Sequence, residues 1–185
     1  WVHPDWGLIT PKEFIPLAEE NGSIIEIEDW VLKQICHYIK EWEQSGSPLV
    51  PISLNKSPKV ILRNDWTKNI FSVLKETNID PSLIEFEITE TALLQTNEIV
   101  KRAFDLLQEV GIRVALDDFG TGYSSLTHLK EYPISTIKID KSFVQNISNN
   151  RDNIIIKSII SLAKGLEIRV VAEGVETIEQ LTFLK

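Results

Sequence analysis

Short apolar runs alternate along the chain with longer stretches in which apolar residues recur at helical spacing. The short runs predict β-strands at residues 52–55, 83–88, 112–116, 136–139 and 168–172. The stretches between them predict helices at residues 66–77, 97–110, 124–131 and 153–166. Strand and helix therefore alternate, and recurring crossover helices make neighbouring strands parallel. The pattern indicates an α/β protein built on a parallel sheet.

Two further helices are predicted ahead of the first strand. The first begins after the capping residue Thr10, with proline in its first turn, and extends to Glu20. The second ends at the turn residues 45–48. One face of this second helix carries residues at helical spacing, most of them apolar: Ile27, Trp30, Val31, Gln34, Ile35, Tyr38 and Trp42. We expect this stripe to face the core.

Two parallel architectures compete, an open doubly wound sheet and a closed eightfold barrel. An open sheet that binds a dinucleotide has a glycine fingerprint between its first strand and helix. Here Gly120 and Gly122 follow the third predicted strand instead, and the third glycine of the fingerprint is missing. A barrel needs eight strands and about 250 residues. A barrel would therefore require that this chain is a piece of a longer one.

Composition excludes several classes of partner. The 185 residues carry 27 acidic and 19 basic side chains, a net charge of −8, which gives no general attraction to duplex nucleic acid or anionic lipid. The apolar runs are much shorter than the ~20 residues that cross a bilayer. The lone Cys36 cannot form an intramolecular disulfide, as expected of a cytoplasmic protein. The chain opens at Trp1 and has no methionine, so we expect an internal segment whose parent protein can carry membrane or sensor domains elsewhere.

Every predicted strand ends in polar groups that can bind or activate a ligand: Asn55; Glu87 and Glu90; Asp117 and Asp118; Lys138 and Asp140; Glu173 and Glu176. In a parallel barrel these strand ends converge on one face. An amide and several carboxylates, without cysteine or histidine, form an oxygen site that prefers magnesium, manganese or calcium to zinc. Taken singly, each residue is better explained as a helix cap or a surface charge. Their recurrence at all five strand ends favours a metal site.

The adjacent carboxylates Asp117 and Asp118 repel each other unless a cation lies between them. A carboxylate that bridges two ions would build a two-metal site, which activates water and neutralises a phosphoryl group during in-line displacement. Lys138 would hold the water or balance the charge that develops. Such a site also explains how an acidic protein can hold a phosphate ester.

Several separated motifs resemble the EAL domain of cyclic di-GMP phosphodiesterases. They are DDFGTGYSS at 117–125, EITE at 87–90, KID at 138–140 and VAEGVET at 171–177, with fitting early segments at 1–7 and 14–22. The resemblance covers essentially the whole chain. It implies a modified (β/α)8 TIM-like barrel, incomplete here, that binds two Mg²⁺ or Mn²⁺ ions and hydrolyses cyclic di-GMP to linear pGpG in bacterial signalling. It also implies a homodimer.

The resemblance assigns roles to individual residues. It implies metal binding by Asn55, Glu87, Asp117, Asp118 and Glu173, with Asp117 bridging the ions. Lys138 matches the lysine beside the attacking water, and we group Lys138, Asp118 and Glu176 as catalytic. Glu90 matches a glutamate that steadies the loop 117–125.

The resemblance also places the tripeptide that names the family before Trp1, and the closing strands after Lys185. We therefore expect residues 1–185 to be a single EAL domain truncated at both ends, with the parent domain as the phosphodiesterase. The alternative is a catalytically inactive module that binds cyclic di-GMP or regulates a partner. The retained metal residues favour the enzyme, because a pure receptor needs no complete metal site.

Overall fold

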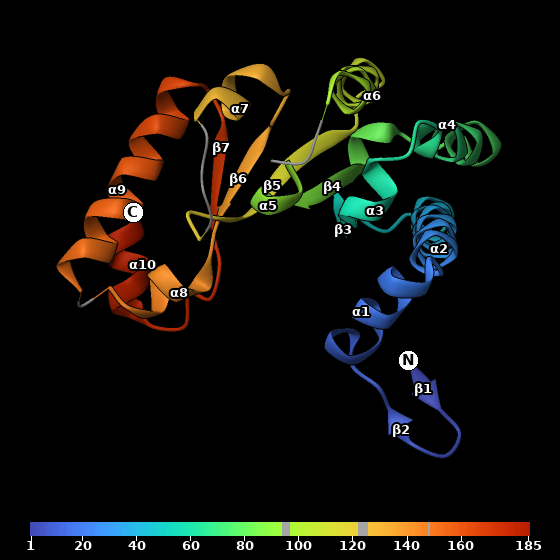
Figure 1. The fold of residues 1–185 in the computed structure, drawn as a ribbon, viewed down its shortest axis with the longest axis horizontal. Coiled ribbons are helices and arrows are strands. Elements are labelled where there is room, and N and C mark those ends of the chain that lie inside the picture. The colour runs from blue at the N-terminus through green and yellow to red at the C-terminus, as the bar shows by residue number, and fades with distance from the viewer. Residues whose placement is uncertain (94–96, 122–125, 148) are drawn as a thin grey trace. The chain divides into compact units, whose positions relative to one another are not determined.

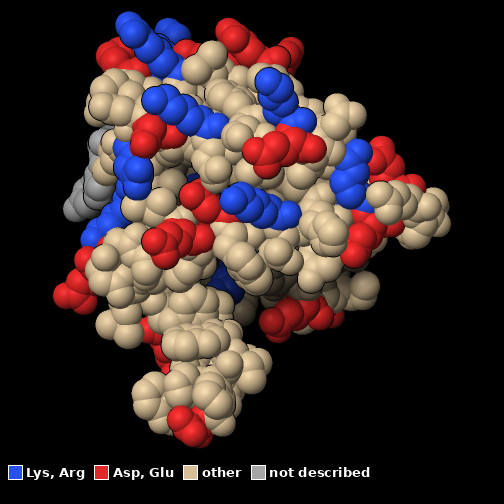
Figure 2. Space-filling view, turned by 90° about the vertical axis from the view of Figure 1, so that its right-hand side faces the viewer, with Lys and Arg blue, Asp and Glu red and all other residues tan. Residues whose placement is uncertain are grey.

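A computed structural model describes residues 1–93, 97–121, 126–147 and 149–185 (Figure 1). The chain divides into two compact units. The first contains Trp1–Val50 and Lys56–Asp80, and the second contains Pro51–Asn55 and Pro81–Lys185. Among the described residues, no helix combines the length and the apolar character that crossing a membrane requires. On the face shown in Figure 2, the described acidic and basic side chains are interspersed.

The first unit consists of a small hairpin and four helices. The antiparallel strands are β1 (Val2–His3) and β2 (Gly7–Leu8), and the helices are α1 (Pro11–Asn21), α2 (Ile24–Ser45), α3 (Pro58–Ile61) and α4 (Trp66–Thr77). A capping box between Thr10 and Glu13 starts α1, as the sequence predicted. The range predicted for α4 is confirmed. The hairpin and α3 were not predicted, because elements this short show no periodicity.

The core-facing stripe predicted for α2 does not coincide with the buried side of the helix: five of its seven residues are half-buried, and none is fully buried. The buried side of the helix consists of Ile24, Glu28, Leu32, Cys36 and Ile39, and it packs in the unit that also contains α1 and α4. Trp30 and Tyr38 are instead 62% and 50% exposed. The pattern misled because apolar residues occur on more than one side of α2, and because the buried side contains an acid. Glu28 can be buried because its Oε2 accepts a hydrogen bond from Lys56 Nζ at 3.0 Å.

The second unit is built on a five-stranded parallel sheet. Its strands lie in the order β3 (Ile52–Asn55), β4 (Ile84–Thr89), β5 (Arg113–Phe119), β6 (Thr136–Ile139) and β7 (Arg169–Ala172). The helical elements are η1 (Pro81–Leu83), α5 (Glu90–Leu93), α6 (Glu98–Glu109), α7 (Leu126–Glu131), α8 (Lys141–Gln145), α9 (Asn150–Gly165) and α10 (Ile178–Leu184). All five predicted strands are confirmed. Residues 124 and 125 of the predicted helix at 124–131 lie outside the described residues.

The strand order decides between the two architectures. Successive strands are neighbours throughout, so the order never reverses as it does in a doubly wound sheet. The helix α6 packs on β5, and α9 packs on β6 and β7. The chain thus forms five consecutive strands of an incomplete (β/α) barrel, which confirms the predicted fold class.

Alternation along β4 separates two faces of the sheet. Phe86 and Ile88, 0% and 1% exposed, point to the apolar side, while Glu85 and Glu87 point to the other. Both glutamates are also buried, at 7% and 9% exposure. A buried face that carries acids requires polar partners.

Candidate active site

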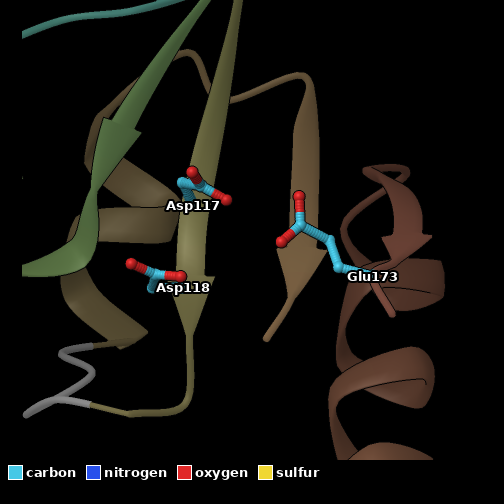
Figure 3. Close-up of side chains that lie close together, drawn as sticks. All are labelled: Asp117, Asp118 and Glu173. Atoms are coloured by element: carbon cyan, nitrogen blue, oxygen red, sulfur yellow. The ribbon is translucent and has the colours of Figure 1, made fainter. Parts of the chain in front are cut away.

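Three carboxylates from distant parts of the chain meet at the carboxyl ends of the strands. Asp117 and Asp118 belong to β5, and Glu173 directly follows β7 (Figure 3). One oxygen of each residue lies within 4.8 Å of the others. The parallel sheet creates this cluster, because it brings the strand ends to one edge.

Lys138 of β6 lies among the carboxylates of three other segments. Its Nζ is 2.9 Å from Glu87 Oε1, 2.9 Å from Asp117 Oδ1 and 2.7 Å from Glu173 Oε1. Burial disfavours the charged ammonium, but hydrogen bonds to Glu173, Asp117 and Glu87 outweigh this effect and raise the pKa of Lys138. The lysine is therefore a fixed positive charge at the centre of the site.

A local irregularity allows both neighbouring aspartates to face the same site. Consecutive strand residues normally point to opposite faces. Between Leu116 and Phe119, however, the pairing of β5 with β6 shifts register, and Asp118 adopts a left-handed φ of 54°. Such bulges re-aim side chains at the ends of strands. This one explains why Asp117 and Asp118 share a cluster.

The electrostatics of Asp118 reflect crowding by negative charge. Burial raises the pKa of its carboxyl group, and the charges of Asp117, Asp140 and Glu173 raise it further. In the metal-free protein, repulsion therefore disfavours full ionisation of this site.

Asp140 is a site residue that sequence analysis noted but did not assign. It caps α8 by accepting a hydrogen bond from the Ser142 backbone N–H at 3.0 Å, and another from the Ser142 hydroxyl. Although burial opposes the shift, these bonds and a hydrogen bond with Asp118 lower the pKa of Asp140. Its position two residues after Lys138, at the end of β6, was the available signal.

Glu90 contacts the start of the loop after β5. It is the first residue of α5 and 4% exposed, and its Oε2 accepts a hydrogen bond from the Gly120 backbone N–H at 3.1 Å. Gly120 has a φ of 96°, and a Cβ there would lie 3.1 Å from the Phe143 ring. The loop path therefore requires glycine at this position. Residues 122–125 of the loop lie outside the described residues.

Two predicted site residues, Asn55 and Glu176, lie at the end of the first strand and after the last strand of the sheet. Asn55 ends β3 on the exposed edge of the sheet, in register with Glu87. Glu176 is exposed between β7 and α10, where its backbone N–H donates to Gln180 Oε1 at 2.6 Å. The cluster of Asp117, Asp118 and Glu173 does not include it.

Comparisons with known proteins agree with the motifs. The EAL domain family model matches residues 1–185. An uncharacterised signalling protein of Caulobacter vibrioides is 45% identical, and the cyclic di-GMP phosphodiesterase NbdA of Pseudomonas aeruginosa is 37% identical. Both alignments cover 100% of this chain but 22% and 24% of the relatives, so the chain spans about a quarter of their length.

A similar solved structure is the PaMucR phosphodiesterase in complex with c-di-GMP. It has a TM-score of 0.92 and 36% identity, and the match covers 100% of this chain and 75% of that chain. The fold of this chain is therefore similar to that of the matched part of this phosphodiesterase.

Proposed function

Because the chain belongs to the EAL domain family, we propose that it forms part of an enzyme that hydrolyses cyclic di-GMP to linear pGpG in bacterial signalling. The observation that carries the proposal is the meeting of Glu87, Asp117 and Glu173 around Lys138, with Asp118 beside them. The phosphodiesterase names of NbdA and PaMucR support the reaction. The family match runs through both compact units, so we assign residues 1–185 to one EAL domain.

The donor atoms of the site fit two Mg²⁺ or Mn²⁺ ions. All of them are oxygens, which hard divalent cations prefer. When ionised, Glu87, Asp117, Asp118, Asp140 and Glu173 carry five negative charges against the single positive charge of Lys138, which leaves −4. Two divalent cations would balance this charge. The ions would supply an activated water and neutralise the phosphate.

We assign the metal-holding role to Asn55, Glu87, Asp117, Asp118 and Glu173. Asp117 contacts the lysine through Oδ1 and also belongs to the three-carboxylate cluster, so it suits a bridging role. Asn55 would contribute a neutral amide oxygen from the strand beside Glu87.

Lys138 would orient the attacking water and offset charge on the phosphate oxygens. Its ammonium keeps its proton at neutral pH. Its three N–H groups are directed at Glu87, Asp117 and Glu173 here, so the water would take the place of one of these carboxylates once the ions hold them. During the reaction the water oxygen bonds to phosphorus, the bond to the leaving ribose oxygen breaks, and that oxygen takes up a proton. A carboxylate oxygen of Asp118 would accept the proton of the water. We also propose Glu176, in the segment between β7 and α10, as a catalytic residue. Glu90 would act as a positioning residue for the loop 117–125.

The test uses purified full-length protein with cyclic di-GMP and either Mg²⁺ or Mn²⁺, followed by product chromatography. We expect pGpG, and no product with a chelator present. The Asp105→Asn variant is a matched control, because it removes a half-buried carboxylate from α6 and should leave turnover unchanged. Tight binding of cyclic di-GMP without turnover under either metal would instead establish the rival function, a nucleotide-binding module.

We further propose that the protein forms a homodimer and is located in the cytoplasm. A homodimer is tested by light scattering of the purified protein, and a cytoplasmic location by fractionation of cells that express it.

A further inference from the structure

A second polar layer lies on the same face of the sheet as the proposed metal site. Glu85 Oε1 accepts hydrogen bonds from Thr136 Oγ1 at 2.8 Å and from Arg169 Nη2 at 2.7 Å. Arg169 also donates to the Thr136 hydroxyl, from Nη2 at 2.9 Å and from Nε at 3.2 Å. Ser53 Oγ lies 3.3 Å from Glu85 Oε2. The layer thus connects β3, β4, β6 and β7.

This polar layer is tied to the site residues through the strands. Ser53, Glu85 and Thr136 each stand two positions before a site residue, namely Asn55, Glu87 and Lys138. Side chains two positions apart on a strand share a face. Any movement of these strands along their axes would therefore move both layers together.

The middle strand leaves room for the network to cross it. Glu85 on β4 reaches Thr136 on β6 although β5 lies between them. On β5, Glu85 pairs with Arg113 and Thr136 pairs with Ala115, so the contact crosses β5 obliquely. Ala115 is fully buried. Its single methyl group leaves the space that a larger barrel-filling residue such as Val or Leu would occupy.

Stability alone does not account for this network. An apolar layer of similar volume is often at least as stable as a buried ion pair, whereas polar contacts of defined geometry fix register. Register is demanding here, because β6 and β7 each have four residues and a slip of one residue moves a strand by about 3.3 Å. Such a slip would abolish the contacts of 2.7–2.9 Å that Lys138 makes.

We propose that Glu85, Thr136 and Arg169 are positioning residues for the site above them. They fix the positions of β4, β6 and β7 relative to one another along the strand axes. These positions determine where Glu87, Lys138 and Glu173 meet. The inference rests on the proposed function in that the site is taken to bind divalent metal.

The test compares Thr136→Val, which keeps the shape but removes the hydroxyl, with Thr136→Ser, which keeps the hydroxyl. Mn²⁺ binding is measured by electron paramagnetic resonance on the full-length protein without substrate. We expect Thr136→Val to bind Mn²⁺ about tenfold more weakly, the low end of the loss seen when a residue hydrogen-bonded directly to a metal ligand is removed, because Thr136 acts on the ligands only through the strands. Thr136→Ser should stay within about twofold of wild type. Arg169→Gln, at a half-exposed side chain, is a second variant if Thr136→Val fails to fold.

Two further measurements separate positioning from general destabilisation. Ile156→Val trims a fully buried side chain of α9, so it lowers stability but should leave Mn²⁺ affinity unchanged. The ammonium NMR signal of Lys138, protected by its three carboxylates, should be lost in Thr136→Val. Wild-type Mn²⁺ affinity with an unchanged Lys138 signal in Thr136→Val would overturn the proposal.

If wild-type protein binds no Mn²⁺, the proposed metal-dependent function fails. The ammonium NMR signal of Lys138 then tests the positioning proposal by itself. Its loss in Thr136→Val would still support positioning, and its persistence would refute it.

Discussion

Asp118→Asn should make the metal-free protein more stable while removing its activity. The folded protein raises the pKa of Asp118 above its unfolded value of about 3.9. The protonated form is therefore favoured by folding, so its contribution to stability is complete below the unfolded pKa and lost as pH rises through the folded pKa. At pH 7 the ionised wild-type residue is a cost, which an amide avoids.

The size of the effect follows from the surroundings of the residue. Asp118 is partly exposed, so solvent screening limits the gain to less than ~1 kcal/mol. For a chain of this length, that corresponds to a melting temperature raised by at most about 2–4 °C. The backbone should not offset the gain, because asparagine tolerates the left-handed φ of 54° at this position.

Thermal unfolding with a chelator, at pH 7 and pH 3, measures this difference. The two proteins should differ at pH 7 and converge at pH 3, where Asp118 is protonated in both states. Saturating Mn²⁺ should reverse the order, because a ligand stabilises in proportion to the logarithm of its affinity and the variant binds more weakly. Asp118→Ala separates charge from backbone, since it removes the repulsion but adds left-handed strain. A variant less stable than wild type at pH 7 without metal would refute the repulsion on which the two-ion site rests.

Three other substitutions test separate parts of the site. Asp117→Asn should abolish hydrolysis with an unchanged circular dichroism spectrum, and wild-type product formation would contradict the bridging role. Lys138→Met should lower stability in urea by about 2 kcal/mol at pH 8, less than for a fully buried pair because Glu173 is partly exposed; an unchanged urea midpoint would contradict the role of the lysine as partner of the three carboxylates. Glu90→Ala should speed amide exchange at Gly120 and reduce turnover; lower turnover with unchanged exchange would mean that Glu90 acts on substrate or metal directly.

The sheet was predictable because its strands are short apolar runs bounded by polar residues. Thr136–Ile139 and Ile52–Asn55 were predicted to the residue, because Ser135 and Asp140 bound the first run, and Pro51 and Lys56 bound the second. The buried side of α2 was not predictable by the same rule. It includes Glu28, and a charged residue counts against burial until its partner Lys56, far along the chain, is known.

Within the site, the strand-end rule predicted which residues gather but not how. Nothing in the sequence indicates the shift in pairing between β5 and β6, yet this shift turns Asp118 to the same face as Asp117. The rule also grouped Glu176 with the site, and this residue lies in the irregular segment between β7 and α10, where it is exposed. Positions inside a strand follow from periodicity, and positions after it depend on backbone geometry that periodicity does not encode.

The two polar layers on the sheet face differ in a way that bears on function. The layer of Glu85 and Arg169 contains one acid and one base, so its charges cancel within the protein. The layer around Lys138 has four more negative than positive charges when its carboxyl groups are ionised. A module that only binds a nucleotide diester gains nothing from excess negative charge beside two phosphates, because like charges repel. The excess negative charge is useful only when external cations complete the site. The charge of the layer around Lys138 therefore favours a metal-dependent hydrolase over a receptor.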